Sequence, residues 1–122
     1  MTTKITHGVL EKIFAVCKEM FPSEIAGILL STNGDETVDD FVFLPGEYTN
    51  MAVYIRDYER PIYHNARGTF HSHPTRSATP SSADKNYFSK FGRIHFIIAY
   101  PYNEKSIRAY DAFGNVSRFE VL

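Results

Sequence analysis

The chain has 122 residues, which is the size of one domain and too short for a multidomain enzyme. Apolar residues make up 43% of it and charged residues 22%, as in globular proteins that fold around a hydrophobic core. Thirteen basic and fourteen acidic residues give a formal charge of −1. Bulk charge therefore draws the chain neither to nucleic acid nor to an anionic membrane. We expect a single domain over residues 1–122.

Cysteine usage limits the chemistry and indicates the compartment. Cys17 is the single cysteine, which excludes an internal disulfide framework and a zinc site built from several cysteines. A metal site must then rest on His, Asp and Glu. No apolar run approaches the roughly 20 residues that cross a bilayer, and no export signal is recognisable. We therefore expect a cytoplasmic protein without a membrane partner, and the sequence does not determine its oligomeric state.

The first half of the chain predicts one helix followed by strands. Apolar residues at three- and four-residue steps indicate a helix that Thr6 caps and Pro22 ends. Its apolar stripe consists of Val9, Leu10, Ile13, Phe14, Cys17, Met20 and Phe21, so Cys17 is interpreted as a buried side chain rather than a reactive thiol. Two strands, Ile25–Leu30 and Val38–Leu44, are predicted to form a hairpin around the Asn33-Gly34-Asp35 turn.

The second half predicts an ordered loop, a second helix and further strands. The expected segments are a short strand Ala52–Arg56, at most a short helix within Asp57–Arg67, a strand Thr69–Ser72, a loop Pro74–Pro80, a helix Ser81–Lys90, a strand Ile94–Tyr100, and a hairpin of Ser106–Ala112 with Val116–Leu122. This order predicts an α+β fold in which helices flank a mixed central β-sheet. Tyr48, Asn50 and Tyr54 are candidates to line a groove for an extended peptide.

The informative motif begins with His71-Ser72-His73-Pro74. Residues two apart on a strand point to the same side, so His71 and His73 can face one ion, and Ser72 points away. Seven residues later comes Ser81-Ser82-Ala83-Asp84, in which Asp84 lies about one helical turn beyond Ser81. Two imidazoles and a carboxylate form a three-ligand set that leaves the fourth position of zinc open, as in catalytic sites.

A hydrolase built on such a site also needs a base and an oxyanion donor. Bound zinc lowers the pKa of its water to about 7, and a base must pass the proton to the leaving amine. Glu24, directly before the apolar strand, is the best candidate for this base. Ser81 is a candidate donor to the oxyanion that forms when a carbonyl is attacked.

At these residues the chain resembles the JAMM metalloproteases, or MPN+ domain. That family has an upstream Glu, then H-S/T-H-P, then S-x-x-D, with seven residues between the second His and the Ser, and the match to Glu24, His71, His73, Ser81 and Asp84 is complete. The resemblance covers nearly the whole chain. It implies the JAMM/MPN fold, which is cytidine-deaminase-like, with one Zn²⁺ per chain. His71, His73 and Asp84 would bind the zinc, Glu24 would be the general base, and Ser81 would support the tetrahedral intermediate.

The resemblance also implies an activity and a partner. Such enzymes cleave peptide or isopeptide bonds after the C-terminal glycines of ubiquitin-like proteins, and prokaryotic members act on small ubiquitin-like or sulfur-carrier proteins. We therefore expect a zinc-dependent peptidase or isopeptidase that works by attack of a zinc-bound water, with Glu24 as the base.

Several alternatives stay open at the level of sequence. Ser81 and Asp84 also fit a helix capping box, and Glu24 also fits a surface acid at a turn. The chain could hydrolyse small molecules or carrier-linked amino acids, or be a non-catalytic module that binds ubiquitin-like partners. The same ligands also accept other divalent ions. The remaining histidines, His7, His64 and His95, have no partner at ligand spacing and are predicted to be structural.

Overall fold

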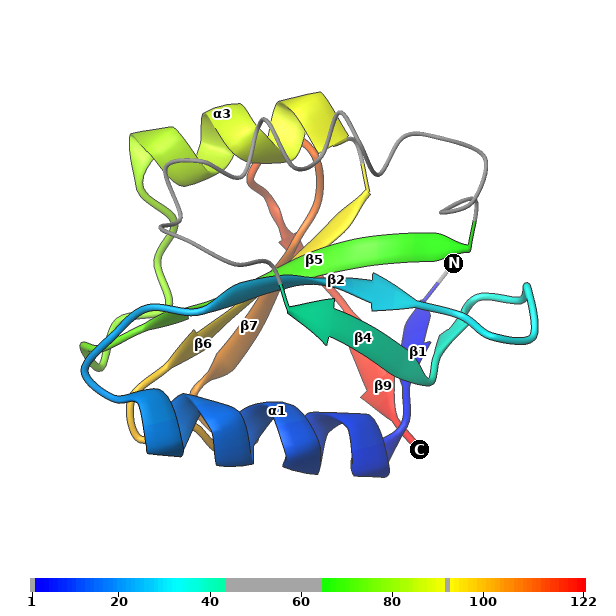
Figure 1. Cartoon of the computed structure of the whole chain (residues 1–122). Coiled ribbons are helices and arrows are strands. Elements are labelled where there is room, and N and C mark those ends of the chain that lie inside the picture. Colours follow the sequence, from blue (N-terminus) through cyan, green and yellow to red (C-terminus); the bar gives the residue numbers. More distant parts are fainter. Residues whose placement is uncertain (1, 44–64, 92) are drawn as a thin grey trace.

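A computed structural model describes residues 2–43, 65–91 and 93–122 (Figure 1). Its helices are α1 (His7–Met20) and α3 (Ser82–Phe91). Its strands are β1 (Thr3–Ile5), β2 (Ala26–Leu30), β3 (Thr37–Val38), β4 (Asp40–Phe43), β5 (Ala66–His73), β6 (Ile94–Ala99), β7 (Ile107–Tyr110), β8 (Val116–Ser117) and β9 (Phe119–Val121). The predicted strand Ala52–Arg56 and residues 57–64 lie outside the described residues, and the last residues of the predicted segment Asp57–Arg67 belong to β5.

Helix α1 forms where the apolar spacing predicts it. The Thr6 side chain accepts a hydrogen bond from the Val9 backbone N–H at 3.3 Å and so caps the first turn. At the other end, the Phe21 N–H donates to the Cys17 carbonyl. The side chains that face the sheet are buried and match the predicted stripe: Val9, Leu10, Ile13, Phe14 and Cys17. Met20 and Phe21, the last members of that stripe, are exposed instead.

Six strands form the central sheet in the order β4-β2-β5-β6-β7-β8. β5 and β6 are parallel, and every other neighbouring pair in this sheet is antiparallel, so the sheet is mixed as predicted. The antiparallel pairs β2–β4 and β7–β8 confirm the two predicted hairpins. Helix α1 covers one face of the sheet and α3 covers the other (Figure 1).

A second sheet, of order β3-β1-β9, departs from the sequence prediction. The predicted strand Val38–Leu44 divides after Val38, because Thr37 and Val38 pair with β1 whereas the residues after Asp39 pair with β2. The predicted strand Val116–Leu122 divides in the same way, since β8 pairs with β7 and β9 pairs with β1. Both divisions let a short chain bury Ile5 and Val38 against α1.

Strand alternation separates two hydrophobic cores. Phe70 on β5 and Ile98 on β6 face α1, together with the buried side chains of that helix. Ile28, Ile97 and Phe88 lie in the core under α3. Because successive side chains of a strand point to opposite faces, His71 and His73 lie on the α3 side of β5. The fold therefore brings the two histidines beneath the helix that carries Asp84.

Candidate metal centre

Strand β5 presents the two histidines at the end of a buried strand. His71 is 1% exposed, and the side chain of His73 is 16% exposed, so the site opens toward solvent on the His73 side. Ser72 points the other way, as predicted, and its hydroxyl oxygen accepts the Ile25 N–H at 2.9 Å. The Ser72 N–H donates to the Ile25 carbonyl, also at 2.9 Å. These bonds fix the residue between the histidines to the start of β2.

The first turn of α3 supplies the carboxylate. Asp84 is 2% exposed, and Phe88, one turn further along the same helix, is fully buried in the core under α3. The Ser81 N–H donates to Asp84 Oδ2 at 2.8 Å, and the Asp84 N–H donates to Ser81 Oγ at 3.0 Å. Ser81 and Asp84 thus form a capping box, which orients the carboxylate without help from a cation.

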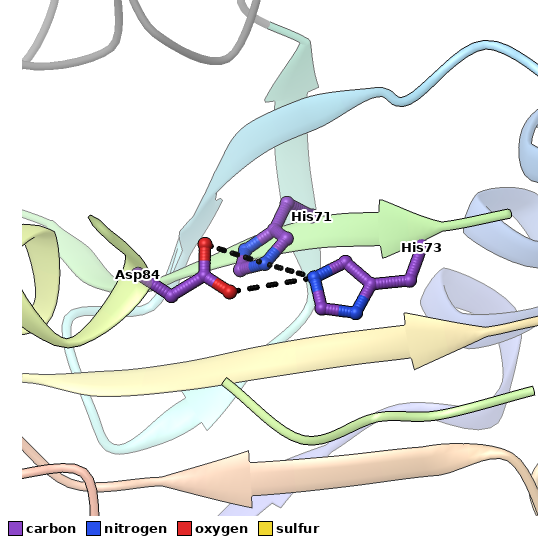
Figure 2. A group of neighbouring side chains, drawn as sticks. All are labelled: His71, His73 and Asp84. Atoms are coloured by element: carbon purple, nitrogen blue, oxygen red, sulfur yellow. Dashed lines mark hydrogen bonds and ion pairs between the residues drawn. The ribbon is translucent and has the colours of Figure 1, made fainter. Parts of the chain in front are cut away.

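The three side chains point toward one another (Figure 2). His71 Nε2 lies 3.1 Å from His73 Nε2. The Asp84 carboxylate reaches both rings: its Oδ1 lies 3.3 Å from His71 Nε2, and its Oδ2 lies 3.4 Å from His73 Nε2. One ligand atom from each residue can be chosen so that all lie within 4.8 Å of one another. Ligand atoms about 2.0–2.1 Å from a tetrahedral zinc ion are about 3.3 Å apart. The donor set and its spacing therefore fit zinc.

A backbone carbonyl orients the second histidine. His73 Nδ1 lies 3.0 Å from the Ser77 carbonyl oxygen, so the proton of the neutral ring belongs on Nδ1 and the lone pair of Nε2 is left free to bind a metal ion. The loop that carries Ser77 is held at two points. The Tyr100 N–H donates to the Thr75 carbonyl at 2.9 Å, and the Tyr110 hydroxyl donates to the Ala78 carbonyl at 2.6 Å. Sequence reasoning missed Ser77, because a backbone carbonyl carries no residue-type signal.

Burial and charge act differently on the two histidines. Burial lowers the pKa of His71 despite the opposing hydrogen bond with Asp84, so His71 is neutral, as a metal ligand must be. Burial also acts to lower the pKa of His73. The hydrogen bonds with Asp84 and the Ser77 carbonyl and the negative charges of Asp84 and Glu24 outweigh burial there, and the pKa of His73 is raised. Protons therefore compete with a cation for His73.

Glu24 lies beside the three residues rather than among them. Ala26 pairs with His71, and Ile25 is hydrogen-bonded to Ser72. Continuing this antiparallel register by one more residue puts Glu24 opposite His73, on the same face of the sheet. Its carboxylate is exposed, and its charge acts to raise the pKa of both histidines. The position suits a base that works at the open side of the site.

Ser81 is exposed, and its hydroxyl oxygen accepts the Asp84 N–H, which is the capping role that the sequence left open. A serine hydroxyl has two acceptor lone pairs and one O–H donor, so the O–H can still donate. The cap and the proposed oxyanion donor therefore use different parts of one hydroxyl group.

Two of the remaining histidines, His7 and His95, lie among the described residues. His95 is fully buried beside Thr69, which agrees with a structural role. His7, for which the sequence predicted no partner at ligand spacing, lies beside two carboxylates: its Nε2 is 3.6 Å from Glu11 and its Nδ1 is 3.4 Å from Glu104. All three side chains are exposed, and the two carboxylates face opposite nitrogens of the ring. His64, Tyr48, Asn50 and Tyr54 lie outside the described residues.

Comparison with known proteins places the chain in a family. The model for prokaryotic homologs of the JAB domain matches residues 6–112. The chain belongs to this JAB family. A Haloferax volcanii protein named a probable metalloprotease is 32% identical to it in an alignment of 130 residues. The alignment covers 97% of this chain and 78% of that protein. The resemblance to JAMM/MPN+ proteins predicted from the sequence is thereby confirmed.

Solved structures of JAB-family proteins share the fold. A JAB1/MPN domain protein from Archaeoglobus fulgidus is 32% identical with a TM-score of 0.79, over 98% of this chain and 99% of that one. A structure described as a JAMM metalloprotease-like zinc site in the proteasome and signalosome is 30% identical with a TM-score of 0.77, over 100% of this chain and 99% of that one.

Among the described residues of this JAB-family chain, no helix is long and apolar enough to span a membrane.

Proposed function

We propose that this JAB-family chain is a zinc-dependent peptidase or isopeptidase that cleaves after the C-terminal glycines of a ubiquitin-like or sulfur-carrier protein. One observation carries the proposal: two imidazole nitrogens and a buried carboxylate converge at the spacing of tetrahedral zinc ligands. The Haloferax relative named a probable metalloprotease and the solved JAMM zinc-site structure support a zinc metalloprotease, and the glycine-ended substrate rests on the family resemblance.

His71, His73 and Asp84 would hold one zinc ion. When bound, zinc supplies a water activated near neutral pH and polarises a carbonyl oxygen. Three protein ligands leave a coordination position for these events, and the exposed side of His73 gives substrate a way in. The buried side of the site, at His71 and Asp84, excludes bulk water and so strengthens the electrostatic interactions there.

Glu24 and Ser81 would perform the proton transfer and the charge stabilisation. Glu24, opposite His73, would take the proton of the attacking water and deliver it to the leaving amine, which is general base and then general acid catalysis. The Ser81 O–H would donate to the oxyanion of the tetrahedral intermediate. Glycines at the scissile end suit a narrow site because they add no side chains, and this preference rests on the family resemblance.

The test uses a ubiquitin-like protein fused to a reporter through its C-terminal glycines. The zinc-loaded chain should cleave after the glycines, and Glu24→Gln should lower kcat by about 10²–10⁴-fold, the usual range for removing a general base. Glu19→Gln, which removes an exposed carboxylate from α1, is the matched control and should leave kcat unchanged. A chelator should abolish cleavage, and added Zn²⁺ should restore it.

Each alternative has its own outcome in this assay. Binding of the ubiquitin-like protein without cleavage by the zinc-loaded chain would identify a binding module. Cleavage of only small or carrier-linked amino-acid substrates would identify a different hydrolase. If Glu24→Gln kept full activity while the chelator abolished it, the assignment of the base would be wrong and the metal site would stand.

A further inference from the structure

His95 is a buried polar side chain that the proposed reaction does not use. It lies on β6 beneath α3 and is 0% exposed. Its ring stacks on the ring of Phe88, with the centroids 4.3 Å apart and the planes 11° from parallel. Polar partners of an imidazole in such a place matter, because an unpaired buried polar atom is costly.

Groups from two other elements hold the ring. His95 Nδ1 lies within hydrogen-bond distance, 2.7 Å, of the hydroxyl oxygen of Thr69 on β5. The contact with α3 is the stack on the Phe88 ring. The hydrogen bond fixes how the ring is turned, and the stack places the ring against the helix.

The two partners of His95 are close in sequence to the candidate metal ligands. Thr69 precedes His71 by two residues on the same face of β5. Phe88 follows Asp84 by four residues, or about one turn, on the same face of α3. The Phe88 ring also lies 6.4 Å from the His71 ring. His95 therefore joins the strand that carries both histidines to the helix that carries the carboxylate.

We propose that His95 is a positioning residue that holds α3 at the separation from β5 at which Asp84 and the two histidines share one cation. The proposal rests on the metal site of the proposed function and adds a residue outside its ligand set. The ring is suited to this role because it combines a stack on α3 with a directed hydrogen bond to β5. Removal of the hydrogen bond would free the ring to turn and let the helix shift while the core stays filled.

The test compares zinc affinity among variants of the whole chain. His95→Phe keeps a ring for the stack but loses the hydrogen bond with Thr69, and Thr69→Val removes the same bond with almost no change in shape. Ile98→Val is the matched control, since Ile98 is a fully buried residue of the same strand that faces α1. Zinc dissociation constants would be measured by competition with a chromophoric chelator, together with the visible spectrum of the Co²⁺-loaded protein and urea unfolding of the metal-free protein.

We expect His95→Phe and Thr69→Val to weaken zinc binding by about tenfold or more, the usual effect of losing a group that orients ligands. Their Co²⁺ spectra should also change, whereas Ile98→Val should keep the native affinity and spectrum at a comparable loss of stability. His95→Gln, which restores a donor and an acceptor, should recover part of the affinity. Native affinity and spectrum in both His95→Phe and Thr69→Val would overturn the proposal.

Failure of the positioning role can be told apart from failure of the proposed function. A native chain that binds zinc and cleaves no substrate, with weaker zinc binding in the two variants, would support His95 as a positioning residue and refute the peptidase. A native chain that binds no zinc would refute both. If His95→Phe does not fold, the milder Thr69→Val carries the comparison.

Discussion

Ser81 and Asp84 hydrogen-bond to each other in both directions, at 2.8 and 3.0 Å. Asp84, whose carboxylate the ligand set requires, is therefore also the residue that completes the capping box of α3 with Ser81. One Asp84 oxygen receives the Ser81 N–H, and the same carboxylate lies within 3.4 Å of both imidazoles. Helix capping and ligand positioning are thus one arrangement, which prepares the carboxylate before any cation binds.

Substitution of Ser81 separates its two roles. Ser81→Ala should reduce the free energy of unfolding by about 1 kcal/mol, whereas Ser81→Gly should cost only a few tenths, because glycine is tolerated at a helix N-cap. Both variants lose the O–H donor, so kcat should fall by about 10²–10³-fold in each. Urea unfolding and steady-state cleavage measure the two effects. Near-native kcat in Ser81→Gly would remove the hydroxyl from the mechanism and leave it as a cap.

The turn before β4 provides a test of pH dependence. Asp39 accepts the Thr32 hydroxyl at 2.5 Å and the Thr32 N–H at 2.8 Å, and these bonds lower the pKa of Asp39 below its ordinary value of 3.8. A carboxyl group whose pKa is lower in the folded chain than in the unfolded chain stabilises the fold at a pH above its unfolded-state pKa. That stability is lost as the pH falls through the folded-state pKa. Asp39→Asn should therefore be less stable than the native chain at neutral pH, and the difference should shrink in strong acid. An unfolding difference that does not vary with pH would contradict this account.

The single cysteine should be inert in the folded chain. Cys17 packs against the sheet and is only 1% exposed, and this burial raises the pKa of its thiol to about 12. Alkylation requires the thiolate, so iodoacetamide at neutral pH should modify Cys17 only after urea unfolds the protein. Mass spectrometry of samples quenched along a urea series measures this. Rapid modification in native buffer, with an unchanged circular dichroism spectrum, would show that the helix opens locally.

Gly27 should not tolerate a side chain. A Cβ at this position of β2 would collide with the Val42 carbonyl oxygen and the Phe70 ring, and backbone cannot yield as a flexible side chain does. Gly27→Ala should therefore lower the free energy of unfolding by about 1–3 kcal/mol, the usual cost of overpacking. Gly8→Ala is the control, since a Cβ at that helical position meets nothing within 4 Å. Chemical denaturation would measure both, and a Gly8→Ala chain as unstable as Gly27→Ala would contradict the steric explanation.

The local patterns of the sequence predicted the elements that surround the site. The apolar steps of α1 and the two-residue spacing of His71 and His73 are properties of single elements, and the structure has them. Both interpretations of Ser81 and Asp84 were open, and the cap exists in the same geometry that suits the ligand. The roles of Glu24 and Ser81 in catalysis stay predictions, because geometry alone does not measure proton transfer.

The second sheet could not be predicted, for a physical reason. Lys4 pairs with Thr37 on one side and with Glu120 on the other, so these contacts join residues far apart in the chain. Strands of two or three residues are too short to show an alternating pattern. β3 and β9 also adjoin another strand in the sequence, so the pattern does not show where one strand ends and the next begins. The support that Ser77 and His95 give the site was hidden for a related reason: one acts through a backbone carbonyl, and the other through partners on two separate elements.

The most direct test of the central claim is a crystal structure of the zinc-loaded chain with anomalous diffraction recorded at the zinc edge. We expect one zinc ion about 2.0–2.2 Å from His71 Nε2, His73 Nε2 and an oxygen of Asp84. Asp84→Ala should remove this anomalous peak. An ion bound elsewhere, for example at the exposed cluster of His7, Glu11 and Glu104, with these three side chains unliganded, would contradict it.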